Sequence, residues 1–317
     1  MGLTIQWIKK NKGPMKLAED CFKRVKKDCF KYIKSQETTT EKFGDKAGMI
    51  KNYLIPICFW IAKKTKNKKP YFVGLAGGQG TGKTTISSII KIILEKYFKL
   101  KVFKISIDDF YKTRKERIAL SKKVHPMLLT RGVPGTHDIN MMLDFFKKSK
   151  SKKFKKMKLP NFNKAIDDRF PTNKWNKINK RPDVIIFEGW CVGAKSQSFK
   201  KLRKPINKLE KIEDKKLKWR KKVNSELNKD YKKIFNLIDK MIFLKVPSFK
   251  FVLRWRLLQE KKLRAKFNGK GIMTIPQVKK FVMYYERITK DMLKDLDKSD
   301  IVINLDKRHR LSEIRFN

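Results

Sequence analysis

Apolar residues recur at helical spacing in the first part of the chain. Two sets of four lie three or four residues apart among lysines and other polar residues, as expected for the buried face of a helix. They are Cys21, Val25, Cys29 and Ile33, and then Ile50, Leu54, Cys58 and Ile61. We therefore predict a layer of helices over residues 1–68.

Short apolar runs follow, separated by polar residues and glycines. They predict strands at residues 71–76, 102–107, 184–187, 241–246 and 301–305, and an apolar helix at residues 86–94 follows the first strand. Strands that alternate with helices are typical of a parallel sheet covered by helices on both faces. The pattern therefore predicts an α/β fold built as a three-layer α/β/α sandwich.

Two long segments fall between these strands. Residues 111–181 form an insertion rich in Pro, Gly and charge, and connections of this length commonly carry function. Residues 199–233 are heavily charged, but a row of apolar positions there marks one face of a helix. The row consists of Trp219, Val223, Leu227, Tyr231 and Ile234.

The chain has 317 residues, of which 40% are hydrophobic, enough for a sizeable core. Its formal net charge of +51 would ordinarily indicate a polyanionic partner such as nucleic acid. The lysines are spread along the whole chain in short groups such as residues 152–156 instead of forming one arm or stripe. We interpret them as solvated surface and expect no specific nucleic-acid partner.

Three features bear on location. The four cysteines show no C-x-x-C spacing, and residues 1–12 become polar too soon for a signal peptide. Gln6 stands where a myristoylation motif needs Ser or Thr. The longest apolar run, residues 53–62, is about half of what a membrane crossing requires and contains Pro56. We expect a cytoplasmic protein without a membrane partner.

The strongest motif is GGQGTGKT at residues 77–84, which satisfies G-x-x-x-x-G-K-[ST] directly after a predicted strand and directly before a predicted helix. In such a loop the backbone amides surround phosphates, the lysine reaches the β- and γ-phosphates, and the hydroxyl faces Mg²⁺. The alternative is a chance glycine turn. The predicted nucleotide-binding residues are Gly77, Gly78, Gln79, Gly80, Thr81, Gly82, Lys83, Thr84 and Thr85.

Acidic residues end the next two strands. Asp108 and Asp109 end the second strand, where one of them can accept the proton of an attacking hydroxyl or help to hold Mg²⁺. A pair of aspartates that caps a helix is the alternative. The third strand ends in Glu188, as in a Walker B segment, whose acid acts on Mg²⁺ or its water. A surface glutamate at a strand end is the simpler reading.

Two further segments are weaker candidates. Residues 131–138, RGVPGTHD, combine a base, a sharp turn and a His-Asp pair, which by themselves indicate only a polar turn. Arg254 and Arg256 follow the fourth strand and could reach a phosphate site as part of a lid. An arginine pair carries little information in a chain this basic.

Taken in order, these motifs resemble those of the D-glycerate 3-kinase family, plant and fungal P-loop kinases related to uridine kinase, pantothenate kinase and phosphoribulokinase. The resemblance rests on the P-loop and on SIDDFY at residues 106–111, RGVPGTHD at 131–138, PDVIIFEGW at 182–190 and VPSFKFVLRWRLLQE at 246–260. It runs from about Tyr53 to about Arg310. Residues 1–45 fall outside it.

The resemblance implies ATP and Mg²⁺ as cosubstrates and a small hydroxy acid as acceptor. It implies Asp108 instead of Asp109 as the base, and Mg²⁺ held by Thr84, Glu188 and Asp108. It implies an acceptor site that contains Arg131, His137, Asp138, Lys164 and Arg169. Where the family has a Tyr-Asp-Lys-Ser run and a glycine-rich stretch before Asp-Arg, this chain has Phe-Asn-Lys-Ala at residues 162–165 and a shorter path to Arg169.

We therefore predict a kinase that phosphorylates D-glycerate on its 3-hydroxyl, with Asp108, Lys83, Glu188, Arg254 and Arg256 as catalytic residues. The expected organisation is a helical extension over residues 1–68 packed on a kinase core over 69–317, with an acceptor-binding insertion at 111–181 and a lid near 247–275. A kinase of the same fold for another acceptor, such as a nucleoside or pantothenate, remains the nearest alternative. A nucleic-acid-stimulated NTPase is a more distant one.

Overall fold

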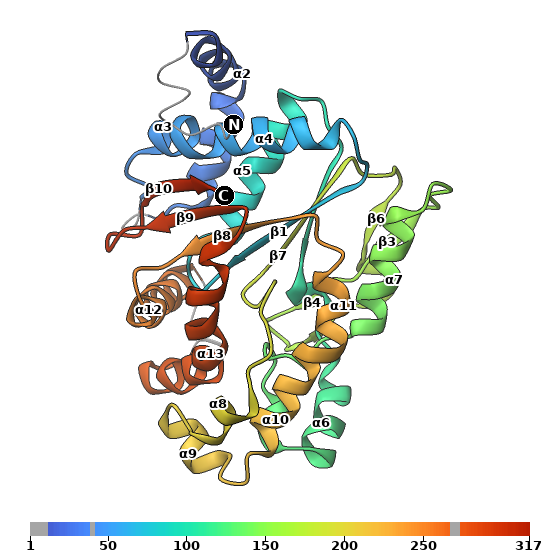
Figure 1. Ribbon diagram of the computed structural model, residues 1–317, viewed down its shortest axis with the longest axis vertical. Helices are drawn as coiled ribbons and strands as arrows, with labels where there is room; N and C mark the ends of the chain where they lie inside the picture. The colour runs from blue at the N-terminus through green and yellow to red at the C-terminus, as the bar shows by residue number, and fades with distance from the viewer. Residues whose placement is uncertain (1–11, 39–41, 267–272) are drawn as a thin grey trace.

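A six-stranded sheet runs through the centre of the molecule (Figure 1). The computed structural model describes residues 12–38, 42–266 and 273–317. The strand order is β10-β9-β8-β1-β7-β2, and all neighbours are parallel except β10, which is antiparallel to β9. The strands are β1 (Tyr71–Gly77), β2 (Val102–Ser106), β7 (Val184–Gly189), β8 (Lys240–Lys245), β9 (Ile301–Leu305) and β10 (Leu311–Phe316).

The central strands are apolar on both faces because helices cover both. Successive side chains of a strand point to opposite faces. In β1, Val73 and Leu75 belong to one buried cluster, whereas Phe72 and Ala76 belong to the other. All seven residues of β1 and all six of β7 are buried. This explains why these strands read as continuous apolar runs in the sequence.

The predicted N-terminal helices lie against one face of the sheet. They are α2 (Lys12–Gln36), α3 (Lys46–Gly48), the π-helix η1 (Met49–Leu54) and α4 (Ile55–Thr65), and α2 and α4 pack on α5 (Lys83–Lys96). All eight apolar positions read from the helical spacing are fully buried. The packing supports the proposed helical extension, although residues 1–11 of it lie outside the described residues.

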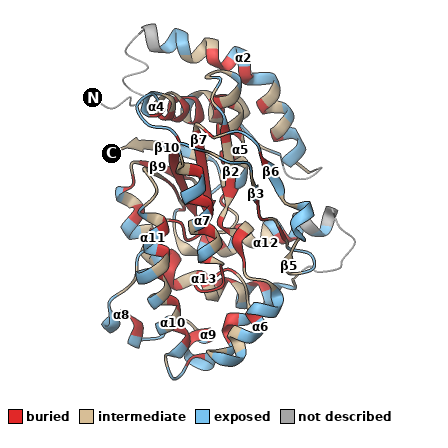
Figure 2. Ribbon diagram, turned by 90° about the vertical axis from the view of Figure 1, so that its right-hand side faces the viewer, coloured by how far each residue is buried: buried red, intermediate tan, exposed pale blue. Residues whose placement is uncertain are grey.

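The buried cluster on the opposite face includes residues of α7 (Ile139–Lys150), α10 (Lys218–Glu226), the π-helix η5 (Leu227–Tyr231) and α11 (Lys232–Phe235). Figure 2 colours the buried residues red. The predicted apolar face from Trp219 to Ile234 is buried throughout. Helices α12 (Phe249–Lys266) and α13 (Ile275–Asp295) pack on each other, and α13 contributes to both buried clusters. Residues 267–272 of the predicted lid are outside the described part.

The long insertion has its own secondary structure. After η2 (Ile107–Phe110), it contains α6 (Arg114–Lys123), η3 (Pro126–Leu129), α7, η4 (Thr172–Lys174) and two small antiparallel sheets, β3 (Met157–Leu159) with β6 (Asn176–Ile178) and β4 (Phe162–Asn163) with β5 (Asp168–Arg169). Arg117 organises it from within: its side chain is 1% exposed and donates hydrogen bonds to the carbonyls of Lys112, Leu129 and Asp167. Those three bonds join α6 to the residues just before it, to the end of η3 and to the residue before β5.

The predicted strand bounds differ from the structure by one or two residues at β1, β7 and β8, and two further differences have a physical reason. The second strand ends at Ser106 instead of residue 107, because the Ser106 hydroxyl and the Asp109 carboxylate form a capping box that starts η2. Strand β10 was not predicted, because its sequence LSEIRF is only partly buried and its apolar pattern is weak. None of the helices within the described ranges is long and apolar enough to cross a bilayer.

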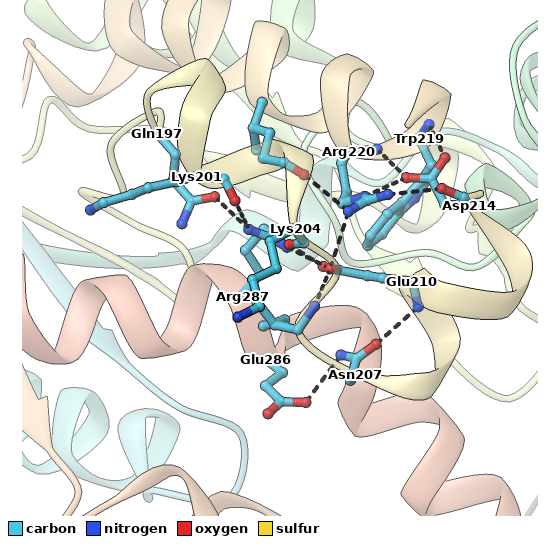
Figure 3. A network of polar contacts seen from close by, with 12 residues as sticks. Gln197, Lys201, Lys204, Asn207, Glu210, Asp214, Trp219, Arg220, Glu286 and Arg287 are labelled. Atoms are coloured by element: carbon cyan, nitrogen blue, oxygen red, sulfur yellow. Dashed lines mark hydrogen bonds and ion pairs between the residues drawn. The ribbon is translucent and has the colours of Figure 1, made fainter. Parts of the chain in front are cut away.

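Buried charges join α13 to the helices that follow β7 (Figure 3). These helices are α8 (Phe199–Arg203), α9 (Lys208–Glu213) and α10. The carboxylate of Glu210, which is fully buried, accepts hydrogen bonds from Nε of Arg287 at 2.7 Å and from a terminal nitrogen at 2.5 Å. Arg220 lies 3.8 Å from Glu210 and donates to Asp214 at 2.8 Å. Each guanidinium also donates to backbone carbonyls, so these charges are well satisfied.

We predict that Glu210→Ala lowers the free energy of unfolding by about 3–5 kcal/mol, because it leaves the buried guanidinium of Arg287 without its carboxylate. Urea denaturation followed by circular dichroism measures the loss. Glu213→Ala is the matched control, since Glu213 pairs with Lys280 at the surface and should change stability by less than about 1 kcal/mol. Equal losses in the two variants would contradict the prediction.

Candidate active site

The loop after β1 has the backbone shape of a phosphate-binding loop. Gly80 and Gly82 have φ values of 76° and 86°, which side-chain-bearing residues rarely adopt. A Cβ on Gly80 would also lie 3.0 Å from the carbonyl carbon of Trp255 in α12, so the helix packs directly on the loop. The loop leads into α5, whose first residue is Lys83. Free amides at a helix N-terminus attract phosphate.

Lys83 is held inside this loop. Its ammonium donates to the carbonyls of Gly77 at 2.9 Å and Gly78 at 2.8 Å. Burial lowers the pKa of Lys83, while the nearby carboxylates of Glu188 and Asp108 act in the opposite direction. A lysine ammonium has three donors, so one remains for a phosphate oxygen.

Glu188 lies next to the loop because of the strand register. It is level with Leu75 of β1 and Ser106 of β2. Its Oε1 accepts a hydrogen bond from the Thr84 hydroxyl at 2.9 Å. Burial raises the pKa of Glu188, and the cations of Lys83 and Lys104 partly counteract this rise. Its Oε2 is buried without a partner in the described chain. A threonine hydroxyl and a buried carboxylate with a spare oxygen fit Mg²⁺, which prefers hard oxygen ligands.

The two aspartates after β2 have different roles. Asp109 accepts from the Ser106 amide at 2.9 Å, so it is the capping residue, and burial raises its pKa to about 6. Asp108 accepts from Lys164 at 2.7 Å and from the Tyr111 hydroxyl at 2.8 Å. Burial alone would raise the pKa of Asp108, but the charge and hydrogen bond of Lys164 and the bond from Tyr111 outweigh it and lower the pKa to about 2.

The residues expected at the acceptor site gather on the insertion. Arg169 donates to the Tyr111 carbonyl at 2.8 Å and lies 3.5 Å from Asp138, which also caps α7. The ring of His137 stacks on Tyr111 with centroids 4.7 Å apart. Together with Lys164 on Asp108, these contacts place four of the five predicted acceptor residues in one connected group.

Arg131 has incomplete charge pairing. It forms an ion pair with Oδ1 of Asp167, but the same oxygen lies 3.0 Å from Arg117. One carboxylate oxygen therefore serves two guanidinium groups. The Arg131 side chain is 28% exposed, so it can also pair with an anionic ligand.

The two lid arginines differ in position. Arg256 pairs with Glu260 one turn further along α12 and lies over the ring of Phe281 in α13. Arg254 is exposed, and the described residues offer it no hydrogen bond or ion pair. In the loop itself, the Thr81 hydroxyl donates to the Gly78 carbonyl, and the Gln79 amide is buried without a described partner. The proposed contacts of Gln79, Thr81, Thr85, Arg254 and Arg256 with nucleotide stay predictions.

Several residues at the site were not predicted to act there, although Tyr231 was placed on an apolar helix face and Trp190 ends a quoted motif. Trp190, Tyr231 and Tyr285 are buried and bond to the turn at residues 131–138, and Arg117 braces the insertion. A buried aromatic residue at helical spacing reads as core, so the sequence carries no signal for these hydroxyl and indole contacts. Tyr111 stood inside a quoted motif, and its bond to Asp108 could have been anticipated from that proximity.

Comparison with known proteins places the chain in a family. No protein-family model matches it. An uncharacterized kinase of Schizosaccharomyces pombe is 34% identical over 229 residues, which cover 68% of this chain and 79% of the yeast protein. The chloroplastic D-glycerate 3-kinase of Arabidopsis thaliana is 30% identical over 252 residues, which cover 74% of this chain but 52% of the plant protein. The chain belongs to the family of glycerate 3-kinase-like P-loop kinases.

A solved structure in this family has the same fold. The D-glycerate 3-kinase of Cryptococcus neoformans superposes with a TM-score of 0.67 over 82% of this chain and 96% of that one, at 23% identity. The predicted P-loop α/β fold and the resemblance are thus confirmed. As a member of the family, the chain is an ATP-using phosphotransferase that acts on the hydroxyl of a small molecule.

We predict that Lys164→Met moves the acidic limb of the pH profile of kcat/KM to higher pH. The ion pair with Lys164 holds the pKa of Asp108 down, so without it burial dominates and the carboxylate becomes protonated at a higher pH. Initial rates between pH 4 and 9 test this, because a limb set by a pKa of about 2 lies below that range and a raised limb enters it. Lys155→Met, which removes the same charge from an exposed position of the insertion, should leave the limb in place. An unchanged limb in Lys164→Met would show that Lys164 does not control Asp108.

Proposed function

We propose that this kinase transfers the γ-phosphate of ATP to the 3-hydroxyl of D-glycerate and forms 3-phosphoglycerate. The observation that carries the proposal is the pairing of Asp108 with Lys164 next to an incompletely paired Arg131. Asp108 supplies a carboxylate that can accept the proton of a hydroxyl, and Arg131 supplies a cation that can pair with the carboxylate of a substrate. A hydroxy acid has both groups.

The phosphate side of the reaction rests on the loop. Its amides and Lys83 would hold the β- and γ-phosphates, and α12 packs against the loop at Gly80. The residues that would hold Mg²⁺ are Thr84 and Glu188, with Asp108 as a further candidate. When bound, Mg²⁺ neutralises charge on the β- and γ-phosphates.

The acceptor side rests on Asp108. The 3-oxygen of glycerate forms a bond to the γ-phosphorus, the bond from that phosphorus to the β,γ-bridging oxygen breaks, and the hydroxyl proton passes to Asp108. A carboxylate with a pKa near 2 is a weak base. This suits a loose transition state, in which the nucleophile loses its proton late and its position matters most. Lys164 and Tyr111 fix the carboxylate from two sides.

The carboxylate of glycerate would pair with Arg131 or Arg169. Arg131 has spare capacity because it shares Asp167 with Arg117. Nε of Arg169 is buried without a described partner. A planar guanidinium binds a carboxylate through two parallel hydrogen bonds, which fixes the orientation of a small acid.

A panel of acceptors tests the substrate. Release of ADP from ATP and Mg²⁺ is measured with D-glycerate, L-glycerate, pantothenate and uridine, and with RNA in place of an acceptor. We expect the highest kcat/KM with D-glycerate and 3-phosphoglycerate as the product by ³¹P NMR. Preference for uridine or pantothenate would favour the same fold with another acceptor, and turnover that rises only with RNA would favour a nucleic-acid-stimulated NTPase.

Asp108→Asn tests the base. It should lower kcat by about 10²–10⁴-fold, the usual contribution of a positioned acid or base, and leave the Kd of ATP within about twofold. Asp109→Asn is the control, because Asp109 caps η2 and is not assigned to the reaction. Comparable turnover of Asp108→Asn and the unmodified enzyme would refute the role of Asp108.

A further inference from the structure

Three buried aromatic residues hold the acceptor turn, defined as residues 131–138. Trp190 donates its indole N–H to the Gly132 carbonyl at 2.8 Å, and Tyr285 donates its hydroxyl to the Arg131 carbonyl at 2.9 Å. The hydroxyl of Tyr231 accepts from the Gly135 amide at 3.0 Å. All three lie outside the insertion, so the turn is fixed by the core.

Tyr231 makes an additional contact to a side chain of the turn. Its oxygen lies 2.5 Å from Nδ1 of His137. The Gly135 amide donates to this oxygen, and among the described residues Nδ1 of His137 is the one acceptor within hydrogen-bond distance of the hydroxyl. A tyrosine hydroxyl has one proton to donate, and a buried donor is normally satisfied. The hydroxyl proton is therefore directed to Nδ1, which must be unprotonated to accept it.

The charge states agree with this direction. Burial raises the pKa of Tyr231 well above its usual range, so the phenol keeps its proton at neutral pH. Burial lowers the pKa of His137 to about 3, with the Asp108 charge acting in the opposite direction, so the imidazole is neutral. A neutral imidazole that accepts at Nδ1 carries its proton on Nε2.

That Nε2–H has no partner within the described residues, although His137 is 1% exposed. Buried donors are normally satisfied, so an exception marks a site where another group is expected. The ring lies face to face with Tyr111, whose hydroxyl bonds to Asp108. The next residue, Asp138, contacts Arg169. Tyr111 therefore links the His137 imidazole to Asp108, the carboxylate assigned as the base.

We propose that Tyr231 is a positioning residue that holds His137 in the Nε2–H form, so that this donor is available to an oxygen of the acceptor. The proposal rests on the proposed function in placing the acceptor beside the turn. The tautomer itself is independent of which acceptor is used. Tyr231 acts only through His137 and the turn.

The first test is ¹⁵N NMR of the histidine side chains in the substrate-free protein. The chain has three histidines, and His137→Gln assigns the signal of interest. We expect His137 to be neutral and protonated on Nε2, and Tyr231→Phe to shift it toward the other tautomer. A His137 protonated on Nδ1 in the unmodified protein would overturn the proposal, whatever the acceptor proves to be and even if the variant does not fold.

The second test separates positioning from general stability. Tyr231→Phe should raise the KM for D-glycerate by about tenfold and leave the KM for ATP within about twofold. Tyr285→Phe is the matched control, because it removes a hydroxyl bond to the same turn without touching His137, and the His137 spectrum should not change. An unaltered KM for D-glycerate in a folded Tyr231→Phe enzyme would also overturn the proposal.

His137 variants provide a further check. Gln carries an amide nitrogen near the position of Nε2, whereas the shorter Asn side chain reaches only the position of Nδ1. His137→Gln should therefore retain a lower KM for D-glycerate than His137→Asn. The reverse order would show that Nδ1 is the atom that matters. If D-glycerate is not turned over, the NMR test still decides the tautomer, so the two proposals fail separately.

Discussion

The parallel register of β1, β7 and β2 is the constraint on which the site depends. It places Leu75, Glu188 and Ser106 level with one another at the carboxyl edge of the sheet. The phosphate loop begins two residues after Leu75, and Asp108 follows two residues after Ser106. The phosphate loop, Glu188 and Asp108 are far apart in the sequence, and the strand register alone brings them to the same edge. The hydrogen bond from Thr84 to Glu188 closes this arrangement.

Throughout the site, burial and charge pairing shift the pKa values of the ionisable groups in opposite directions. Lys83 and Glu188 are shifted toward their neutral forms by burial, and each is pulled back by the charge of the other. Asp108 is the exception, because Lys164 and Tyr111 outweigh burial and keep it ionised. The result is a carboxylate fixed as an anion beside a lysine that can turn from its loop carbonyls to a phosphate. An anionic ligand would complete these pairings, as the proposed function requires.

The sequence predicted the sheet and the loop well because both depend on local patterns. The apolar strands β1, β2, β7, β8 and β9 and the glycine-rich loop are each contiguous in sequence, and their period and spacing are visible in a single chain. The insertion was less accessible. Its fold depends on Arg117, a buried charge that looks like one more surface arginine in a chain of net charge +51. The capping role of Asp109 and the position of Asp108, whose carboxylate does not cap η2, could be distinguished only once Ser106 was seen to start η2.

The parts of the site that contact phosphate and acceptor are therefore built on different physical principles. The loop depends on backbone conformation, so it is encoded in a short motif. The acceptor turn has no regular backbone structure of its own, and its position comes from Trp190, Tyr231 and Tyr285 on three separate elements. The helix that carries Tyr285 is in turn tied through Arg287 to the buried Glu210. A change in acceptor preference can thus arise far from the turn, through the packing of α13. The phosphate loop at the sheet edge does not depend on these contacts to the turn.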